Sequence, residues 1–126
     1  MNNMDPIKDP DNEYPVPEEW RDTFRAIVDR FVARDYQLSI GVEGVFPVSD
    51  DTSSQIADFI EDYGETLIPL LESTWSSSVT RWMGDHWVVL VDLCTEAEGV
   101  SDLVLHANVG EVHDQYTYEI HLVYVP

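Results

Sequence analysis

The last third of the chain, residues 87–126, most constrains what this sequence can fold into. Apolar and polar residues alternate through three stretches separated by short polar connections: Trp87–Cys94, Asp102–Val109 and Tyr116–Val125. Because successive side chains on a strand point to opposite faces, this period of two predicts three strands, each with an apolar face. The short connections predict an antiparallel meander. On the last strand the residues expected to face inward are Tyr116, Tyr118, Ile120, Leu122 and Tyr124.

Two helices are predicted before this sheet. The first is expected from Pro17, which suits the start of a helix, to about Arg34, with an apolar stripe at helical spacing: Trp20, Phe24, Ile27, Val28 and Phe31. The second is expected from the capping box of Thr52 and Gln55 to Gly64, a natural helix stop. Its expected apolar face is Ile56, Phe59, Ile60 and Tyr63.

The remaining segments are predicted to be extended. Residues 1–16 contain prolines among Asp and Asn and are expected to form an extended, acidic arm. Alternation favours a short strand over Leu38–Val42 and an edge strand over Trp75–Met83. The predicted fold class is therefore α+β, with residues 17–126 as a single domain. Two N-terminal amphipathic helices are expected to pack on one face of a C-terminal antiparallel β-meander of three to five strands.

Charge is the most unusual property of the chain. Twenty-five acidic residues against six Lys and Arg give a formal net charge of −19. Residues 35–126 hold seventeen of the acids and one base, Arg81. Such a surface repels nucleic acid and anionic lipid, because both are bound by neutralising phosphates with Lys and Arg. It would attract a basic protein partner, although solubility alone or a halophilic proteome also explains acidity.

Composition limits the other classes of protein. With 44% hydrophobic and 11% aromatic residues, the chain has enough apolar side chains to fold. The single cysteine, Cys94, excludes an internal disulfide and a thiolate zinc cluster. The sequence has neither an apolar signal-peptide region nor a run of about 18 apolar residues, so no membrane association is expected. These features favour a cytoplasmic protein that is a monomer or a weak dimer.

The residues that could carry chemistry form no recognisable catalytic or metal-binding motif. Among the four histidines, His106 and His121 share parity on neighbouring strands, and Asp92 could complete a site of two histidines and one carboxylate. No compact ligand pair such as HExxH supports that site. The acidic residues around 92–102 lack the alternating ligands of a calcium loop, and Ser76–Ser78 lack a nucleophile motif. No metal, cofactor or enzymatic activity is therefore predicted.

The clustering of carboxylates instead predicts a site for a protein partner. Four acids surround the connection between the first two predicted strands, and the preceding turn adds an acid beside a histidine and tryptophan. Tryptophan is common in cores, but it is also common where binding energy concentrates at interfaces. The residues predicted to bind the partner are Glu96, Glu98, Asp102, Asp92, Asp85, His86 and Trp82.

The segment from Trp87 to Leu103 also carries a resemblance. Its residues WVVLVDLCTEAEGVSDL resemble the pattern W-x-V-x-V-D-L-x-T-x-E-E-G-x-S-D-L of an uncharacterised family of small bacterial proteins. The likeness covers about the last third of the chain, with weaker similarity over Tyr63–Leu67. The sequence departs from it at Cys94, where an aromatic residue is expected, and at Ala97, where an acid is expected. Membership would imply a small α+β fold and no particular activity.

In size and acidity the chain is similar to immunity proteins of contact-dependent growth inhibition and other polymorphic toxin systems. The functional hypothesis is accordingly a non-catalytic immunity protein that neutralises a basic, nuclease-type toxin domain through its acidic surface. One alternative is a nucleic-acid mimic, with carboxylates in rows at phosphate-like spacing. Another is a small ligand-binding protein or enzyme of the SnoaL/NTF2 type, with a polar pocket among His106, Glu119 and His121.

Overall fold

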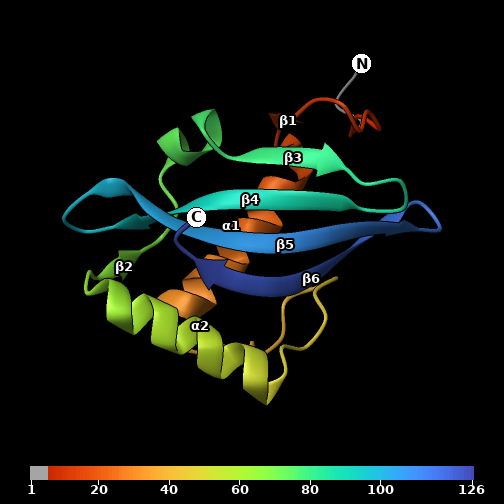
Figure 1. The fold of residues 1–126 in the computed structure, drawn as a ribbon. Helices are drawn as coiled ribbons and strands as arrows, with labels where there is room; N and C mark the ends of the chain where they lie inside the picture. The colour runs from red at the N-terminus through yellow and green to blue at the C-terminus, as the bar shows by residue number, and fades with distance from the viewer. Residues whose placement is uncertain (1–5) are drawn as a thin grey trace.

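The computed structural model describes residues 6–126, and it has the predicted α+β class (Figure 1). Its helices are α1 (Glu18–Val32), α2 (Asp50–Tyr63) and the short 3₁₀ helix η1 (Glu72–Ser76). The strands are β1 (Tyr14–Pro15), β2 (Leu67–Ile68), β3 (Val79–Trp82), β4 (Trp87–Thr95), β5 (Gly99–Val112) and β6 (Gln115–Tyr124). Within residues 6–126, no helix is both long and apolar enough to cross a membrane.

All strands belong to one antiparallel sheet. The order across it is β1-β3-β4-β5-β6, and β2 pairs with the far end of β4, where Ile68 faces Cys94. The consecutive strands β3 to β6 form the predicted meander. Of the arm predicted to be extended, residues 1–5 lie outside the described residues, and residues 10–12 form a turn instead. Tyr14–Pro15 are extended, pair with β3 and add an edge strand.

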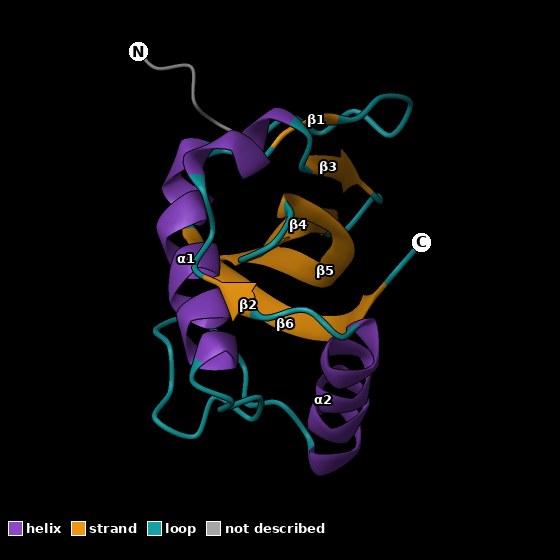
Figure 2. Ribbon diagram, turned by 90° about the vertical axis from the view of Figure 1, so that its left-hand side faces the viewer, coloured by secondary structure: helices purple, strands orange, loops and turns teal. Residues whose placement is uncertain are grey.

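Helix α1 covers one face of this sheet (Figure 2). Its predicted stripe is almost completely buried: Trp20, Phe24, Ile27, Val28 and Phe31. The inward residues of β4 and β5 are buried as well, including Trp87 and Leu105. The Trp20 ring meets the Trp87 ring edge-on at 5.3 Å between centroids, and Phe24 meets Tyr118 in the same way at 5.7 Å. These aromatic contacts fix α1 across the sheet.

Helix α2 occupies a different place from the one expected. It packs beside the edge strand β6, whereas α1 lies across the face of the sheet (Figures 1 and 2). Its N-cap is Ser49, whose hydroxyl accepts a hydrogen bond from the Thr52 amide, so the helix begins before the predicted cap. Gly64 ends it in the left-handed conformation, as predicted. Of the expected apolar face, Phe59 is 42% exposed because this helix contacts an edge.

Residues 35–49 differ from the predicted strand. They form turns, apart from a single parallel bridge in which Val45 meets Tyr118 of β6. The Tyr118 amide donates to the Gly44 carbonyl at 2.9 Å, and the Phe46 amide donates to the Tyr118 carbonyl at 2.9 Å. This loop therefore satisfies backbone groups of β6 that an edge strand would otherwise leave unpaired.

A β-bulge in β6 changes which of its side chains face inward. Ala107 pairs with Ile120 while His106 pairs with Leu122, so β6 contains one extra residue, His121. The alternation reverses there, and Val123 is fully buried. The prediction that Leu122 and Tyr124 continue the inward face was therefore wrong, because the extra residue shifts the parity beyond it.

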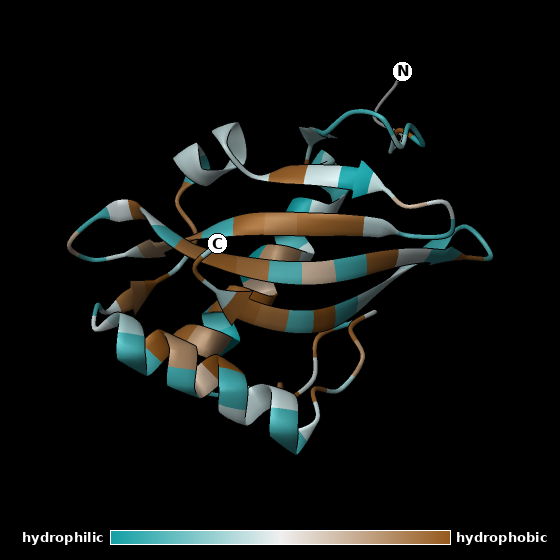
Figure 3. Ribbon diagram, viewed as in Figure 1, coloured by the Kyte–Doolittle hydropathy of each residue, from teal (hydrophilic) through white to brown (hydrophobic). Residues whose placement is uncertain are grey.

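The face of the sheet opposite α1 carries no helix in the described chain (Figure 2). It presents residues such as Val88, Leu90, His106 and Asn108, which are only partly buried. Colouring by hydropathy shows hydrophilic residues interrupting β5 and β6, whereas β4 is hydrophobic along most of its length (Figure 3). This face is thus mixed in polarity, as expected for an antiparallel sheet with one solvated side.

Candidate partner-binding surface

The predicted partner-binding residues fall into two groups at opposite ends of the meander. Glu96, Glu98 and Asp102 lie in the β4–β5 hairpin, at the left in Figure 1. Trp82, Asp85 and His86 lie at the β3–β4 turn, at the right. Successive connections of a meander alternate between ends, so the two groups cannot form one continuous patch. We call them the hairpin end and the turn end.

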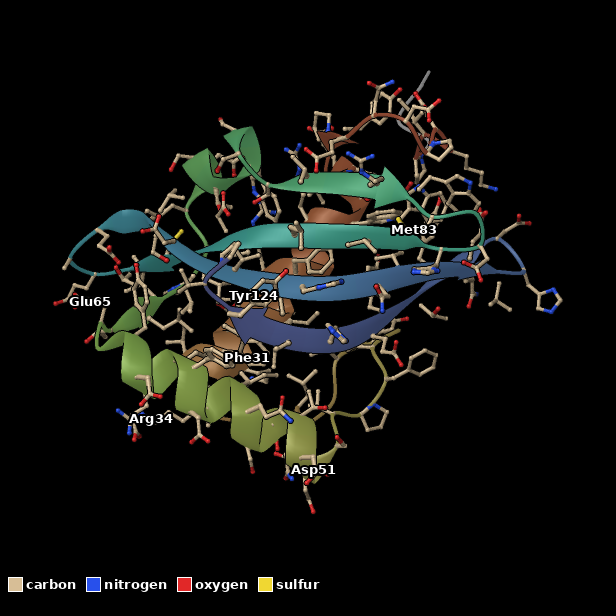
Figure 4. All side chains as sticks on the ribbon, viewed as in Figure 1. Phe31, Arg34, Asp51, Glu65, Met83 and Tyr124 are labelled. Carbon is tan, nitrogen blue, oxygen red and sulfur yellow. The ribbon has the colours of Figure 1, made fainter. Side chains whose placement is uncertain are left out.

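At the hairpin end the carboxylates are exposed and close to other acids. Residues 96–98 form the connection between β4 and β5, and Glu96 is anchored by its amide, which donates to the Thr66 carbonyl at 2.8 Å. Glu65 directly precedes Thr66, and its side chain points outward on the same side of the molecule as the hairpin (Figure 4). Among the described residues no ion pair reaches Glu65, Glu96, Glu98 or Asp102. The hairpin end therefore has exposed negative charge without a basic neighbour bound to it.

The Glu98 carboxylate is held by a residue that sequence reasoning assigned to the core. The Tyr63 hydroxyl, at the end of α2, lies 2.8 and 3.0 Å from the two oxygens of Glu98 and donates to them. The Thr95 hydroxyl donates to Glu98 Oε1 at 3.0 Å, and the Asp102 amide donates to Tyr63 Oη at 3.3 Å. Burial raises the pKa of Tyr63, and the bond to Glu98 raises it further. Tyr63 thus fastens the hairpin to α2.

We expect Tyr63→Phe to loosen this hairpin while leaving the fold intact. The change removes one hydrogen bond to a carboxylate on the surface, so the free energy of unfolding should fall by about 1 kcal/mol. Amide hydrogen exchange at Asp102 should become faster, because its acceptor is lost. Tyr36→Phe is the matched control, since the Tyr36 ring packs against Phe31 and makes no such bond to the hairpin. Equal exchange rates at Asp102 in both variants would contradict the role of Tyr63.

Asp92 is separated from the other hairpin acids by its position on the uncovered face of β4. Its carboxylate accepts a hydrogen bond from the Ser77 hydroxyl, and its amide donates to Ser78 Oγ at 2.9 Å. Its carbonyl accepts from the Thr74 hydroxyl. Asp92 therefore joins η1 and the start of β3 to β4, which is a structural role rather than a place in an exposed acidic cluster.

Two histidines form a pair on the uncovered face. The rings of His106 and His121 lie 4.6 Å apart between centroids, and the Tyr124 ring lies 6.2 Å from His106. Within residues 6–126 no group of three His, Cys, Asp or Glu side chains is arranged to hold a metal ion. Asp92 thus does not complete a three-ligand site with the pair. Burial lowers the pKa of His106, and the neighbouring His121 lowers it further.

This lowered pKa predicts how stability depends on pH. The folded protein binds a proton at His106 less readily than the unfolded chain, whose histidine pKa is about 6.5. Well above pH 6.5 the histidine is neutral in both states, so His106 should not change the free energy of unfolding. As the pH falls from 6.5 toward the folded-state pKa, the unfolded chain takes up the proton more readily, and the free energy of unfolding should decrease. His106→Gln should lose less stability than the unmodified protein in urea denaturation between pH 7.5 and 5.5. Equal losses in the two proteins would contradict this assignment.

At the turn end the expected aromatic anchor is already in contact with the rest of the protein. The Trp82 ring lies 4.6 Å from the Trp87 ring, and the Lys8 ammonium lies 5.2 Å from the Trp82 centroid. The Asp85 carboxylate and the His86 ring are 2.6 Å apart, and the Asp85 side chain is 86% exposed. Met83, in the same turn, is 51% exposed (Figure 4). Sequence reasoning missed Lys8 because the arm was interpreted as separate from the domain.

Comparison with known proteins identifies the family of the chain and names no function for it. The model of a family described as "Domain of unknown function (DUF7668)" matches residues 28–126, from the second half of α1 to the C-terminal end. No curated protein and no solved structure matches the chain. The match covers the whole meander, α2 and the hairpin end, and it leaves the arm, β1 and the first part of α1 outside. Because it spans well over half of the sequence, the chain belongs to the DUF7668 family.

Proposed function

We propose that this protein is a non-catalytic immunity protein that binds and neutralises a basic toxin domain of nuclease type. The observation that carries the proposal is the hairpin end, where Glu96, Glu98 and Asp102 are exposed and no ion pair within residues 6–126 reaches them. A cleft that binds phosphates is lined by Lys and Arg, and exposed carboxylates on a hairpin can occupy it.

Electrostatics would supply much of the association rate. The chain has a net charge of −19, so a positively charged domain would be attracted before contact, which raises on-rates by about 10- to 1000-fold at low salt. The carboxylates of the hairpin end repel each other in the free protein. Lys and Arg side chains of the partner next to Glu96 and Asp102 would offset that repulsion. The negative charge of the hairpin end therefore favours the complex over the free protein.

The hydrogen bonds of Tyr63 would support binding in a second way. They hold Glu98 in one orientation against α2 before any partner arrives. A preorganised carboxylate loses less conformational entropy on binding than a freely rotating one. The hairpin end would therefore present a charged surface of fixed shape, which favours one cognate partner over basic proteins in general. A cytoplasmic location belongs to the same proposal, because that is where a nuclease-type toxin would act.

A nucleic-acid mimic is a second candidate, supported by the distribution of carboxylates. Exposed acids also follow the outer side of α2, at Asp58, Glu61 and Asp62, so the negative surface extends beyond the hairpin end. A mimic would inhibit several unrelated DNA-binding proteins, whereas an immunity protein inhibits one toxin.

The geometry offers less support for a SnoaL-type protein. The residues of its expected pocket, His106, Glu119 and His121, lie on the uncovered face of the sheet. The space between α1 and the sheet is filled by aromatic rings.

The experiment uses the protein and the C-terminal domain encoded by a large toxin gene next to its own. We expect the two to elute from size-exclusion chromatography as a 1:1 complex, and the nuclease activity of the toxin domain to be lost at equimolar ratio. A non-cognate toxin domain of similar charge is the control and should keep its activity. Equal inhibition of both domains would support the nucleic-acid mimic, and separate elution with full activity would contradict the proposal.

A further inference from the structure

The N-terminal arm is folded against the turn end. The Trp87 indole donates to the Ile7 carbonyl at 3.1 Å, and Arg81 Nη1 donates to the Pro10 carbonyl at 3.1 Å. Within the arm, Asp9 accepts hydrogen bonds from the Asn12 amide group and the Tyr14 hydroxyl, which lower the pKa of Asp9 to about 2. These contacts, with those of Lys8, place residues 6–15 against Trp82 and Trp87.

Between the arm, the start of α1 and the β5–β6 turn lies a pocket of about 470 Å³. Three carboxylates line it, Glu19, Glu111 and Asp114, and they come from three different elements of the fold. The rings of Trp87 and Tyr116 form its apolar part. Carboxylates beside aromatic faces are the surroundings that stabilise an ammonium or guanidinium group.

One of the lining residues is itself a cation. The Lys8 ammonium lies 3.2 Å from Glu111 Oε1 and 5.2 and 5.8 Å from the centroids of Trp82 and Trp87. Lys8 is the one base of the chain before Arg21, and it reaches this pocket from the arm. Lys8 is itself one of the residues that line the pocket, and its ion pair with Glu111 shows that this part of the lining accommodates a basic side chain.

The Lys8 contact can be exchanged at low cost. Its side chain is 53% exposed and that of Glu111 is 37% exposed, so water screens the ion pair. Ion pairs of this kind add little net stability, because the Coulomb attraction is weak in water and ordering the side chain costs entropy. A basic side chain from another molecule would meet Glu111 and the Trp87 and Tyr116 rings, which line the pocket. It would also find Glu19 and Asp114, which make no ion pair in the described chain.

We propose that this pocket receives a Lys or Arg side chain of the basic partner and that Lys8 is its intramolecular placeholder. The proposal rests on the proposed function, since it adds a second contact at the opposite end of the meander from the hairpin end. When the partner's side chain enters, Lys8 leaves Glu111 for solvent. The arm then stays attached through Ile7, Pro10 and β1, whose contacts do not depend on Lys8.

The test uses the complete chain and a probe with one guanidinium, the peptide acetyl-Gly-Arg-Gly-amide. Binding is followed through the NMR signals of the Trp82 and Trp87 indole N–H groups. We expect Lys8→Gln to bind the probe about fivefold more tightly than the unmodified protein, because the competing cation is gone. The double variant Lys8→Gln, Glu111→Gln should lose this gain in affinity for the probe. The neutral peptide acetyl-Gly-Gln-Gly-amide should leave both signals unchanged.

The matched control for charge is Arg34→Gln, which removes one positive charge from an exposed position two residues after the end of α1. It should change the affinity for the probe less than twofold. The proposal is overturned by equal gains in Lys8→Gln and Arg34→Gln, by no gain in Lys8→Gln, or by equal binding of the neutral peptide. None of these measurements uses the toxin domain. A failed pocket would leave the 1:1 complex with the toxin intact, whereas a failed immunity function would leave the probe binding intact.

Discussion

Replacing Phe24 by alanine is expected to reduce the free energy of unfolding by about 3–5 kcal/mol. Phe24 is fully buried on α1, and its ring meets the Tyr118 ring edge-on. The substitution leaves a cavity between helix and sheet that the surrounding aromatic rings cannot fill. Leu105→Ala, on the opposite side of the same core, should cost about 2–5 kcal/mol. Both values are measured by urea denaturation followed by circular dichroism.

The control is Phe59→Ala, the same chemical change at an exposed position of α2. We expect it to cost less than about 1 kcal/mol, because little apolar surface is removed from the core. Losses below about 0.5 kcal/mol for Phe24→Ala and Leu105→Ala would show that α1 does not pack on the sheet as described.

The largest expected effect on binding comes from neutralising the hairpin end. In a variant with Glu96→Gln, Glu98→Gln and Asp102→Asn, association with the basic toxin domain should slow by about tenfold at low salt. The association rate should also depend less on salt, because fewer charges attract the partner. Stopped-flow kinetics at several ionic strengths measures both effects, and circular dichroism checks that the variant is folded.

A second triple variant separates the effect of where the charges lie from the effect of how many there are. Asp58→Asn, Glu61→Gln and Asp62→Asn remove three negative charges from the outer side of α2, where the side chains are also exposed. We expect this variant to associate within about twofold of the unmodified protein. Equal slowing in the two variants would mean that net charge, and not the hairpin end, attracts the partner. Slowing in the α2 variant alone would move the binding site to α2.

The alternation of the last forty residues predicted the meander because strands buried on one face must repeat with period two. The stripe from Trp20 to Phe31 likewise predicted a helix with one buried face. The bulge at His121 was not predictable, since an extra residue leaves no sign in an alternating pattern that mixes apolar and polar side chains. The position of α2 depends on its contacts with β6, which is distant in the sequence, and a local pattern contains no information about such contacts.

The candidate site was predicted in part. The acids of the hairpin end stood out because they cluster in a connection between strands and have no base nearby. Their attachment to Tyr63 depends on a contact between residues 35 positions apart, and Tyr63 also fits the apolar stripe of α2. Lys8 was missed for a similar reason: a proline-rich arm predicts extended backbone but gives no sign of where it packs. Asp92 shares a sequence neighbourhood with the hairpin acids, yet its strand position turns its side chain toward Ser77.

Growth of bacteria that express the toxin domain tests the central claim most directly. Cells that also express this protein should grow as cells without the toxin do, and cells that express the hairpin-end triple variant at the same level should grow more slowly. The α2 triple variant should protect as well as the unmodified protein. If cells carrying the unmodified protein stop growing as soon as the toxin domain is induced, with both proteins present in soluble form, the protein is not the immunity partner of that toxin.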